Sequence, residues 1–377
     1  MKKQIKNVFL IQSVNAFIVG ILTVVLPLLM EDRGINIVSI GLIYASLPII
    51  FQLTRMGFAI LSDFIGRKIF FLLTGIMNVF YTAIYYFASG PLGFLFGKVV
   101  EGTKEASIWS VNRPFILEHA KNKRKGLIQM RAIDSVSTAL GSLIAGFLIA
   151  WLFYPNTIIL TLLIGLLIIP FALAMKDKRV KRFDVIKAYK LLDYKRKGKF
   201  FKIALVILCL MGLSYGLIAG YVFPLFLKSN GFNVEWIGLL LGFQTLLAGV
   251  FTYFCIGKIK LWKLIFYSGI AYSIVLFLLG VSSVLISSIL VILFLLFGIV
   301  SGAVDAGVEG IFSRVADSES YSIDIGLLFM GFHSARTVSL MLSGFLIASF
   351  GFIAPISLSA FIFIGYFILA YRTFRKT

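Results

Sequence analysis

Four charged residues close together in an apolar stretch are the side chains of this sequence best suited to handling a proton. Lys98, Glu101, Lys104 and Glu105 lie within eight residues, and helical spacing places the first, second and fourth on one face. Two carboxylates one turn apart oppose each other's ionisation, so one of them can hold a proton near neutral pH. The pattern predicts a proton or substrate site; the alternative is a charge network that only holds helices together.

Other apolar stretches carry isolated polar residues of the same kind. Asp305 and Glu309, four residues apart, repeat the acidic pair, and we add Asn15, His333 and Arg336 to the candidate substrate or proton pathway. Each charge near the centre of a bilayer costs about 2.5–3.5 kcal/mol on insertion scales, so it needs a partner or a water-filled cavity. For His333 a proton relay and a satisfied polar residue remain equally open.

Three further charged residues lie near the predicted cytoplasmic ends of their stretches. These are Arg113, Arg131 and Asp134. At that depth long side chains reach the headgroup region or form ion pairs between helix ends. We therefore expect them to act as a cytoplasmic latch.

The composition shows which elements must hold these residues. Of 377 residues, 60% are hydrophobic and 14% are charged, with a mean hydropathy of +1.00. Soluble domains are about 45–50% apolar, so a soluble enzyme, a secreted disulfide scaffold and a disordered chain are excluded. A membrane enzyme would need a nucleophile with a base, or a metal site. Only two histidines are present, so we predict no enzymatic activity, metal or cofactor.

Helices that cross the membrane are the predicted elements, because lipid offers the backbone no hydrogen-bond partners. The sequence contains twelve apolar runs and is predicted to be an all-α integral membrane protein. The approximate limits are 7–29, 37–61, 69–88, 92–115, 127–151, 155–175, 203–227, 236–257, 264–281, 285–313, 323–349 and 352–371.

The distribution of basic residues predicts the orientation. The net charge is +20, yet the predicted outer loops hold only Arg33 and Lys228, while most other basic residues fall on the side of the amino end. This asymmetry follows the positive-inside rule, so we expect a multi-pass protein of the cell membrane with both termini in the cytoplasm. The basic segment 176–202 is expected to lie on anionic lipid headgroups and not to bind nucleic acid.

The two halves of the chain resemble each other. PLLMEDRGINIVSIGL begins at Pro27 and PLFLKSNGFNVEWIGL begins at Pro224, and the two segments agree at seven of their sixteen positions. Six crossings per half give both halves the same orientation, which is a transporter architecture. We predict two six-helix bundles, 1–175 and 203–377, in a parallel pseudo-twofold repeat joined by the linker 176–202.

The joint after the second run carries a recognisable signature. Residues 59–68 read AILSDFIGRK, which resembles the G-x-x-x-D-x-x-G-R-[RK] signature of the major facilitator superfamily, with Ala59 replacing the first glycine. Gly66 permits a tight turn, while Arg67 and Lys68 hold the joint to the cytoplasm. The resemblance implies that Asp63 and Arg67 latch the two halves together on the inner face. The alternative is a positively charged turn without a gating role.

The resemblance implies the fold and the mode of action. In that family the first, fourth, seventh and tenth spans line a central cavity, so both acidic clusters would face it. The function expected is secondary active transport of a small organic solute by alternating access, with proton-coupled export of an amphipathic or cationic compound as the first choice. Uptake or facilitated passage of a polar metabolite is the alternative, and a non-transporting receptor or scaffold is the rival from another class. We expect a monomer.

Antiporters of the family often carry G-x-x-x-G-P-x-x-G-G in the fifth span. Residues 137–146 read STALGSLIAG, which keeps Gly141 and Gly146 but places Ser142 at the proline position. Close helix packing through small residues explains the two glycines equally well. The pattern favours antiport only slightly.

Overall fold

The structure is a computed structural model that describes residues 2–120, 123–176, 197–255, 259–281, 287–315 and 321–375. All regular secondary structure in these ranges is helical, as the composition predicts. The chain forms two compact units, one of Met1–Phe183 with Leu227–Thr245 and the other of Asp184–Phe226 with Leu246–Thr377. Most of the predicted linker, 177–196, lies outside the described residues.

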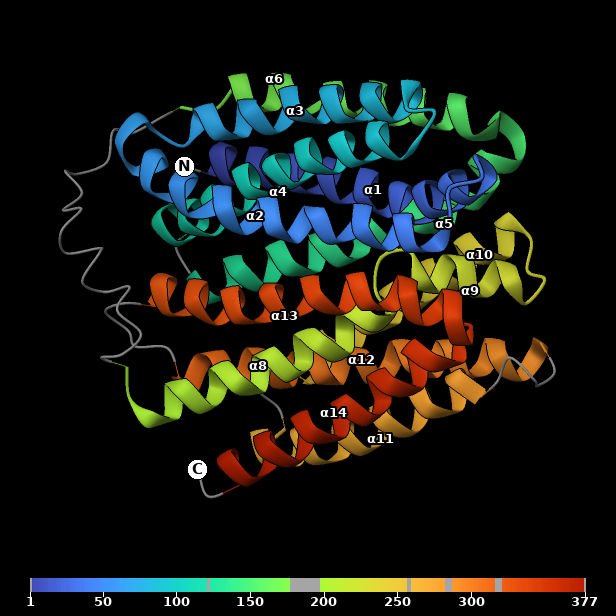
Figure 1. Ribbon diagram of the computed structural model, residues 1–377. Helices are drawn as coiled ribbons and strands as arrows, with labels where there is room; N and C mark the ends of the chain where they lie inside the picture. Colours follow the sequence, from blue (N-terminus) through green and yellow to red (C-terminus); the bar gives the residue numbers. More distant parts are fainter. Residues whose placement is uncertain are drawn as a thin grey trace. The chain divides into compact units, whose positions relative to one another are not determined.

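The first unit is built on six helices from the amino-terminal half of the chain. They are α1 (Lys2–Asp32), α2 (Ile37–Ile65), α3 (Lys68–Phe87), α4 (Pro91–His119), α5 (Lys123–Leu166) and α6 (Ile168–Leu173). Helix α1 packs along α5, α2 packs along α4, and α3 contacts α4, α5 and α6 (Figure 1). Helix α4 therefore has α2 and α3 as neighbours for most of its length.

A break in the backbone divides α5. Phe153 has φ 60° and ψ 167°, outside the helical region, and Pro155 follows two residues later. Proline lacks an N–H group and cannot donate the hydrogen bond that would continue the first segment, so Pro155 suits the start of the second. The break falls between the predicted runs 127–151 and 155–175, which are joined here in one helical element.

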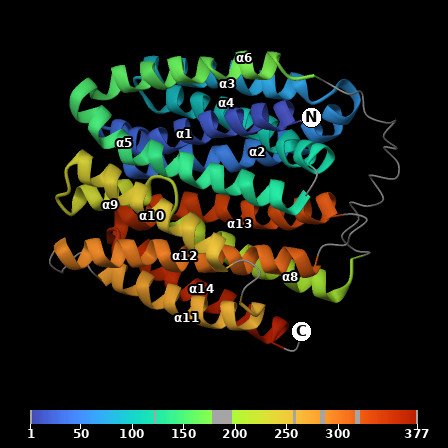
Figure 2. The ribbon, with the colours of Figure 1, turned by 180° about the vertical axis from the view of Figure 1, so that it is seen from behind.

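The second unit contains the remaining helices of the described chain (Figure 2). They are α8 (Lys199–Ile218), α9 (Val222–Ser229), α10 (Val234–Cys255), α11 (Leu261–Val281), α12 (Ser287–Val315), α13 (Tyr321–Phe350) and α14 (Ile353–Phe374). The end of α9 and the first half of α10, Leu227–Thr245, belong to the first unit. Between α8 and α9 the backbone turns at Gly220, with φ 71°, so the seventh predicted run is a broken helix.

Ten helical segments of the described chain are long and apolar enough to cross a membrane. The difference from the twelve predicted runs has two visible causes. Residues 129–173 count as one segment because the helical turns on the two sides of the break at Phe153 follow each other directly. Helix α4 is not among the ten, because its central turns carry the four charged residues described above.

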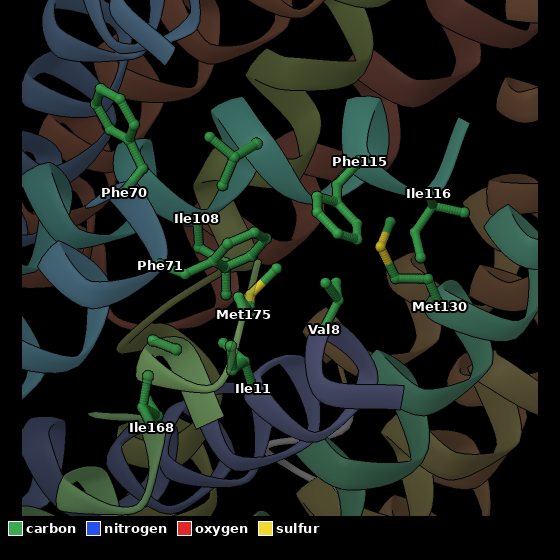
Figure 3. Close-up of a cluster of buried hydrophobic side chains, with 12 residues drawn as sticks. Val8, Ile11, Phe70, Phe71, Ile108, Phe115, Ile116, Met130, Ile168 and Met175 are labelled. Atoms are coloured by element: carbon green, nitrogen blue, oxygen red, sulfur yellow. The ribbon is translucent and has the colours of Figure 1, made fainter. Parts of the chain in front are cut away.

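One end of the first unit is filled by a cluster of apolar side chains (Figure 3). In a membrane such packing stabilises through close van der Waals contact, because lipid tails are as apolar as the core. The cluster closes the end of the unit at which α1 begins and α4 ends. Its labelled members are Val8, Ile11, Phe70, Phe71, Ile108, Phe115, Ile116, Met130, Ile168 and Met175.

Glycines set the closest helix contacts. A methyl group on Gly141 of α5 would collide with the carbonyl oxygen of Phe17 in α1, and one on Gly212 of α8 would collide with the carbonyl oxygen of Phe332 in α13. Backbones approach this closely only where a side chain is absent. The predicted packing role of Gly141 is thus visible in the structure, and it requires no transport chemistry.

The two turns that the sequence repeat makes equivalent have the same local structure. Gly34 and Gly231 both have positive φ, 71° and 83°. The side-chain oxygens of Asn36 and Asn233 each accept a hydrogen bond from the backbone N–H three residues later, at 2.8 and 3.0 Å. Both are N-terminal helix caps of the kind asparagine favours. Aligned residues therefore form equal turns.

Candidate transport site

Helix α4 brings Lys98 and Glu101 together inside the first unit. Their Nζ and Oε2 atoms are 2.7 Å apart, and the two side chains are only 4% and 9% exposed. The hydroxyl of Tyr85, on α3, donates a hydrogen bond of 2.5 Å to the same carboxylate oxygen. Glu101 is therefore a buried carboxylate with a charge partner one turn away and a donor from a neighbouring helix.

A second pair follows one turn later on α4. Lys104 Nζ lies 2.5 Å from Glu105 Oε1 and donates a hydrogen bond of 2.9 Å to Asn15 on α1. The indole N–H of Trp109 donates to the other oxygen of Glu105 at 2.9 Å. Glu105 is 14% exposed, whereas Lys104 is fully buried. This pair links α4 to α1, and its carboxylate, Glu105, is partly exposed.

Each of the two carboxylates of the predicted like-charge pair contacts its own lysine. The charges of these two pairs sum to zero. A tyrosine ring also lies near each lysine. Lys98 Nζ is 4.3 Å from the centre of the Tyr44 ring, and Lys104 Nζ is 5.1 Å from the centre of the Tyr81 ring. The arrangement is a neutral charge network lined by aromatic faces.

The residues predicted to form a cytoplasmic latch connect to this network. Asp134 on α5 accepts a hydrogen bond of 2.7 Å from Gln12 on α1, and Gln12 accepts one of 3.1 Å from Asn112 on α4. The guanidinium of Arg113 lies 5.6 Å from the centre of the Trp109 ring. Two of the three latch residues thus face the interior of the first unit. Arg131, on α5, is half-buried.

The signature joint has the backbone that its glycine predicts. Gly66 ends α2 with φ 95° and ψ 162°. Arg67 is buried, and its Nη2 lies 2.5 Å from Oε1 of Glu118 at the end of α4. Lys68 donates a hydrogen bond of 2.7 Å to the carbonyl oxygen of Leu173. The side chain of Asp63 lies outside the described residues.

Sequence reasoning missed Tyr85 and Glu118 as members of these networks. Glu118 lies at a predicted cytoplasmic joint, where charges are expected in any membrane protein. Tyr85 lies among several aromatic residues of the third run. No spacing rule singles out either residue, because their partners come from another helix.

The second unit carries its candidate residues on α12 and α13. Asp305 and Glu309 are half-buried on α12. On α13 the ring of His333 stacks on that of Phe329, with centroids 5.9 Å apart. The guanidinium carbon of Arg336 lies 5.2 Å from the centre of the Tyr215 ring of α8. Within the described ranges no group of three or more His, Cys, Asp or Glu residues could hold a metal ion.

Comparison with known proteins decides the family. Residues 8–289 match the sequence profile of the Major Facilitator Superfamily. The chain belongs to this superfamily. A match over this length covers the first unit from residue 8 onward, including the signature joint and helix α4. The resemblance seen in residues 59–68 is thereby confirmed, and the protein is a non-enzymatic membrane transporter of that family.

Solved structures of the superfamily share the fold. The crystal structure of a mutant of the nucleoside transporter NupG superposes with a TM-score of 0.78 over 99% of both chains, at 11% sequence identity. That of the human organic anion transporter MFSD10 (TETRAN) has a TM-score of 0.69, with 15% identity over 98% of this chain and 99% of the other. No curated protein sequence matches the chain. At such identities the likeness concerns the fold alone.

Proposed function

We propose that this protein is a secondary active transporter that moves a small polar organic solute by alternating access and couples it to protons through Glu105. The observation that carries the proposal is the neutral network on α4, with one carboxylate partly exposed. Charges at membrane depth face the interior of a bundle or a water-filled cavity and mark substrate and proton pathways.

Glu105 is the proton carrier in this proposal. Glu101 has a buried lysine and a tyrosine hydroxyl on one oxygen, at 2.7 and 2.5 Å, so its ionised form is well satisfied. Glu105 is more exposed and can exchange a proton with water. When it is protonated, Lys104 keeps its bond to Asn15 but loses its counter-charge. States of the transporter that bury Lys104 to different degrees then differ in energy, and protonation shifts their populations.

The membrane topology belongs to the same proposal. Twelve crossings in two parallel six-helix repeats account for the break at Phe153 and for the equal turns at Gly34 and Gly231. With both termini in the cytoplasm, the Arg67–Glu118 pair lies at the inner end of the first unit. There it supports the signature joint that the family uses as a latch. We place the protein in the cell membrane, as a monomer, with its basic segments against anionic lipids.

The proposed direction is export, with uptake as the alternative. The glycines of the antiporter-like pattern favour export, whereas Ser142 stands at its proline position and donates a hydrogen bond of 3.0 Å to the carbonyl oxygen of Gly20. Glu101 and Glu105 are each paired with a lysine. This network therefore carries little net negative charge to attract a cationic solute. The solute is therefore proposed as polar, without a cationic requirement from this network.

Counterflow in proteoliposomes tests the proposal. Purified protein is reconstituted, loaded with unlabelled solute, and diluted into the labelled form. The panel consists of nucleosides and organic anions, the classes named for the similar solved structures, together with quaternary ammonium compounds. At least one class should give saturable counterflow that empty liposomes lack. Binding without counterflow would instead identify a receptor, and flux that never saturates would identify a channel.

A further inference from the structure

Arg336 is a charge in the middle of a membrane-spanning helix, and it has no ion-pair partner among the residues that the structure describes. It is the sixteenth of the thirty residues of α13. None of the described carboxylates forms an ion pair with its guanidinium, and its buried Nε has no hydrogen-bond partner. The lysines of α4 each have a carboxylate within 2.7 Å. Arg336 therefore differs in kind from the charges of the first unit.

The contact between α8 and α13 positions Arg336 against an aromatic ring. Gly216 of α8 lies against the backbone of Arg336, because a Cβ there would come within 2.6 Å of the Arg336 carbonyl oxygen. The preceding residue, Tyr215, presents its ring to the guanidinium at 5.2 Å. Tyr215 is 40% exposed, and its ring also contacts that of Phe332, with centroids 6.0 Å apart. Arg336 itself is half-buried, so its guanidinium lies beside a partly exposed aromatic ring.

Magnitudes show that the tyrosine does not compensate for the charge. A cation–π contact contributes about 0.5–2 kcal/mol, whereas a mid-membrane arginine costs about 2.5–3.5 kcal/mol on insertion scales. The remainder must come from water or from a ligand that brings a negative charge. Guanidinium groups bind carboxylates and similar planar oxyanions through two parallel hydrogen bonds.

We infer that Arg336 and Tyr215 form the anion subsite of the transported solute, and that this solute is an organic anion with a planar or aromatic body. The anionic group bonds to the guanidinium while the body stacks beside the tyrosine ring. The inference rests on the proposed transport function and adds the substrate class to it.

Matched probes test the charge requirement in detergent-solubilised full-length protein. Benzoate is compared with benzamide, benzenesulfonate with benzenesulfonamide, and benzyltrimethylammonium serves as the cation; binding is followed by the shift in melting temperature. A charge-assisted hydrogen bond of about 1.5–3 kcal/mol predicts that at least one anion binds roughly tenfold or more tightly than its amide. The inference is overturned if neither anion stabilises the protein more than its amide does, or if the cation stabilises it most.

Variants test whether Arg336 is the residue that binds the anion. Arg336→Met should abolish the stabilisation by the anion, Arg336→Lys should retain part of it, and Arg372→Gln, at an exposed position on α14, should leave it unchanged. Without ligand, Arg336→Met should melt no lower than the wild type, because it removes an uncompensated charge. A strongly destabilised Arg336→Met, or one that still binds the anion, contradicts the subsite.

Counterflow separates this inference from the transport proposal. Labelled benzenesulfonate is suited to it, because a sulfonate stays ionised and crosses lipid poorly by itself. Saturable counterflow of nucleosides or cations without anion binding would leave transport standing and refute the anion subsite. Anion binding that depends on Arg336, with no counterflow of any solute, would support the anion subsite and refute the transport proposal.

Discussion

Glu101 and Glu105 lie one helical turn apart on α4, and each is paired with its own lysine, at 2.7 Å from Lys98 and 2.5 Å from Lys104. Their environments nevertheless differ. Glu101 is buried with a tyrosine donor, whereas Glu105 is partly open and is tied through Lys104 to α1. Two chemically equal residues therefore lie in unequal environments, which is why Glu105, and not Glu101, is proposed as the proton carrier.

The first prediction concerns the structural pair. Lys98→Met leaves Glu101 buried without its charge partner, and breaking such a pair costs about 3–5 kcal/mol. We expect a large fall in melting temperature in detergent. The double variant Lys98→Met/Glu101→Gln should recover most of the loss, because no charge is then left unpaired. Equal stability of Lys98→Met and the wild type would show that Lys98 and Glu101 do not form a buried ion pair.

The second prediction concerns the α1–α5 contact. Gly141→Ala brings a methyl group into the carbonyl oxygen of Phe17, so the helices must separate, at a cost of about 1–3 kcal/mol. Gly57→Ala on α2, where nothing lies within 4 Å, is the matched control and should be neutral or slightly stabilising. Thermal unfolding of both variants measures the difference. Equal melting temperatures would contradict the packing described.

The third prediction concerns the signature joint. Arg67 and Glu118 should show a coupling energy of about 0.5–3 kcal/mol in a double-mutant cycle of Arg67→Gln and Glu118→Gln. The pair joins the start of α3 to the end of α4, with Arg67 buried and the Glu118 side chain 38% exposed. Unfolding midpoints of the four proteins give the coupling. Strict additivity would mean that the two groups do not interact.

The fourth prediction concerns Glu31 and Lys228, which are equivalent positions of the sequence repeat and form an ion pair of 2.8 Å. Their side chains are 44% and 39% exposed, so solvent screens the pair and it contributes no more than about 0.2–1 kcal/mol. The coupling between Glu31→Gln and Lys228→Gln should fall as salt is raised. A large coupling that does not depend on salt would show that the pair is shielded from water.

The family, the helical class and the α4 cluster were predictable, because they depend on composition and on spacing within single segments. The turn at Gly66 was predictable for the same reason. The partners were not: Tyr85 reaches Glu101 and Gln12 reaches Asp134 only once α3 and α1 pack beside α4 and α5. The prediction that one of the two acids on α4 holds a proton rests on their spacing, which does not show the lysine that each carboxylate contacts.

The most direct test of the central claim is solute accumulation driven by a pH gradient in proteoliposomes that contain the Glu105→Gln variant. It uses the solute that gives saturable counterflow, with Glu235→Gln, in the first turn of α10, as the control carboxylate. We predict that Glu105→Gln still exchanges solute in counterflow but no longer accumulates it in response to the gradient, while Glu235→Gln does both. Gradient-driven accumulation by Glu105→Gln at the wild-type level would contradict proton coupling through Glu105.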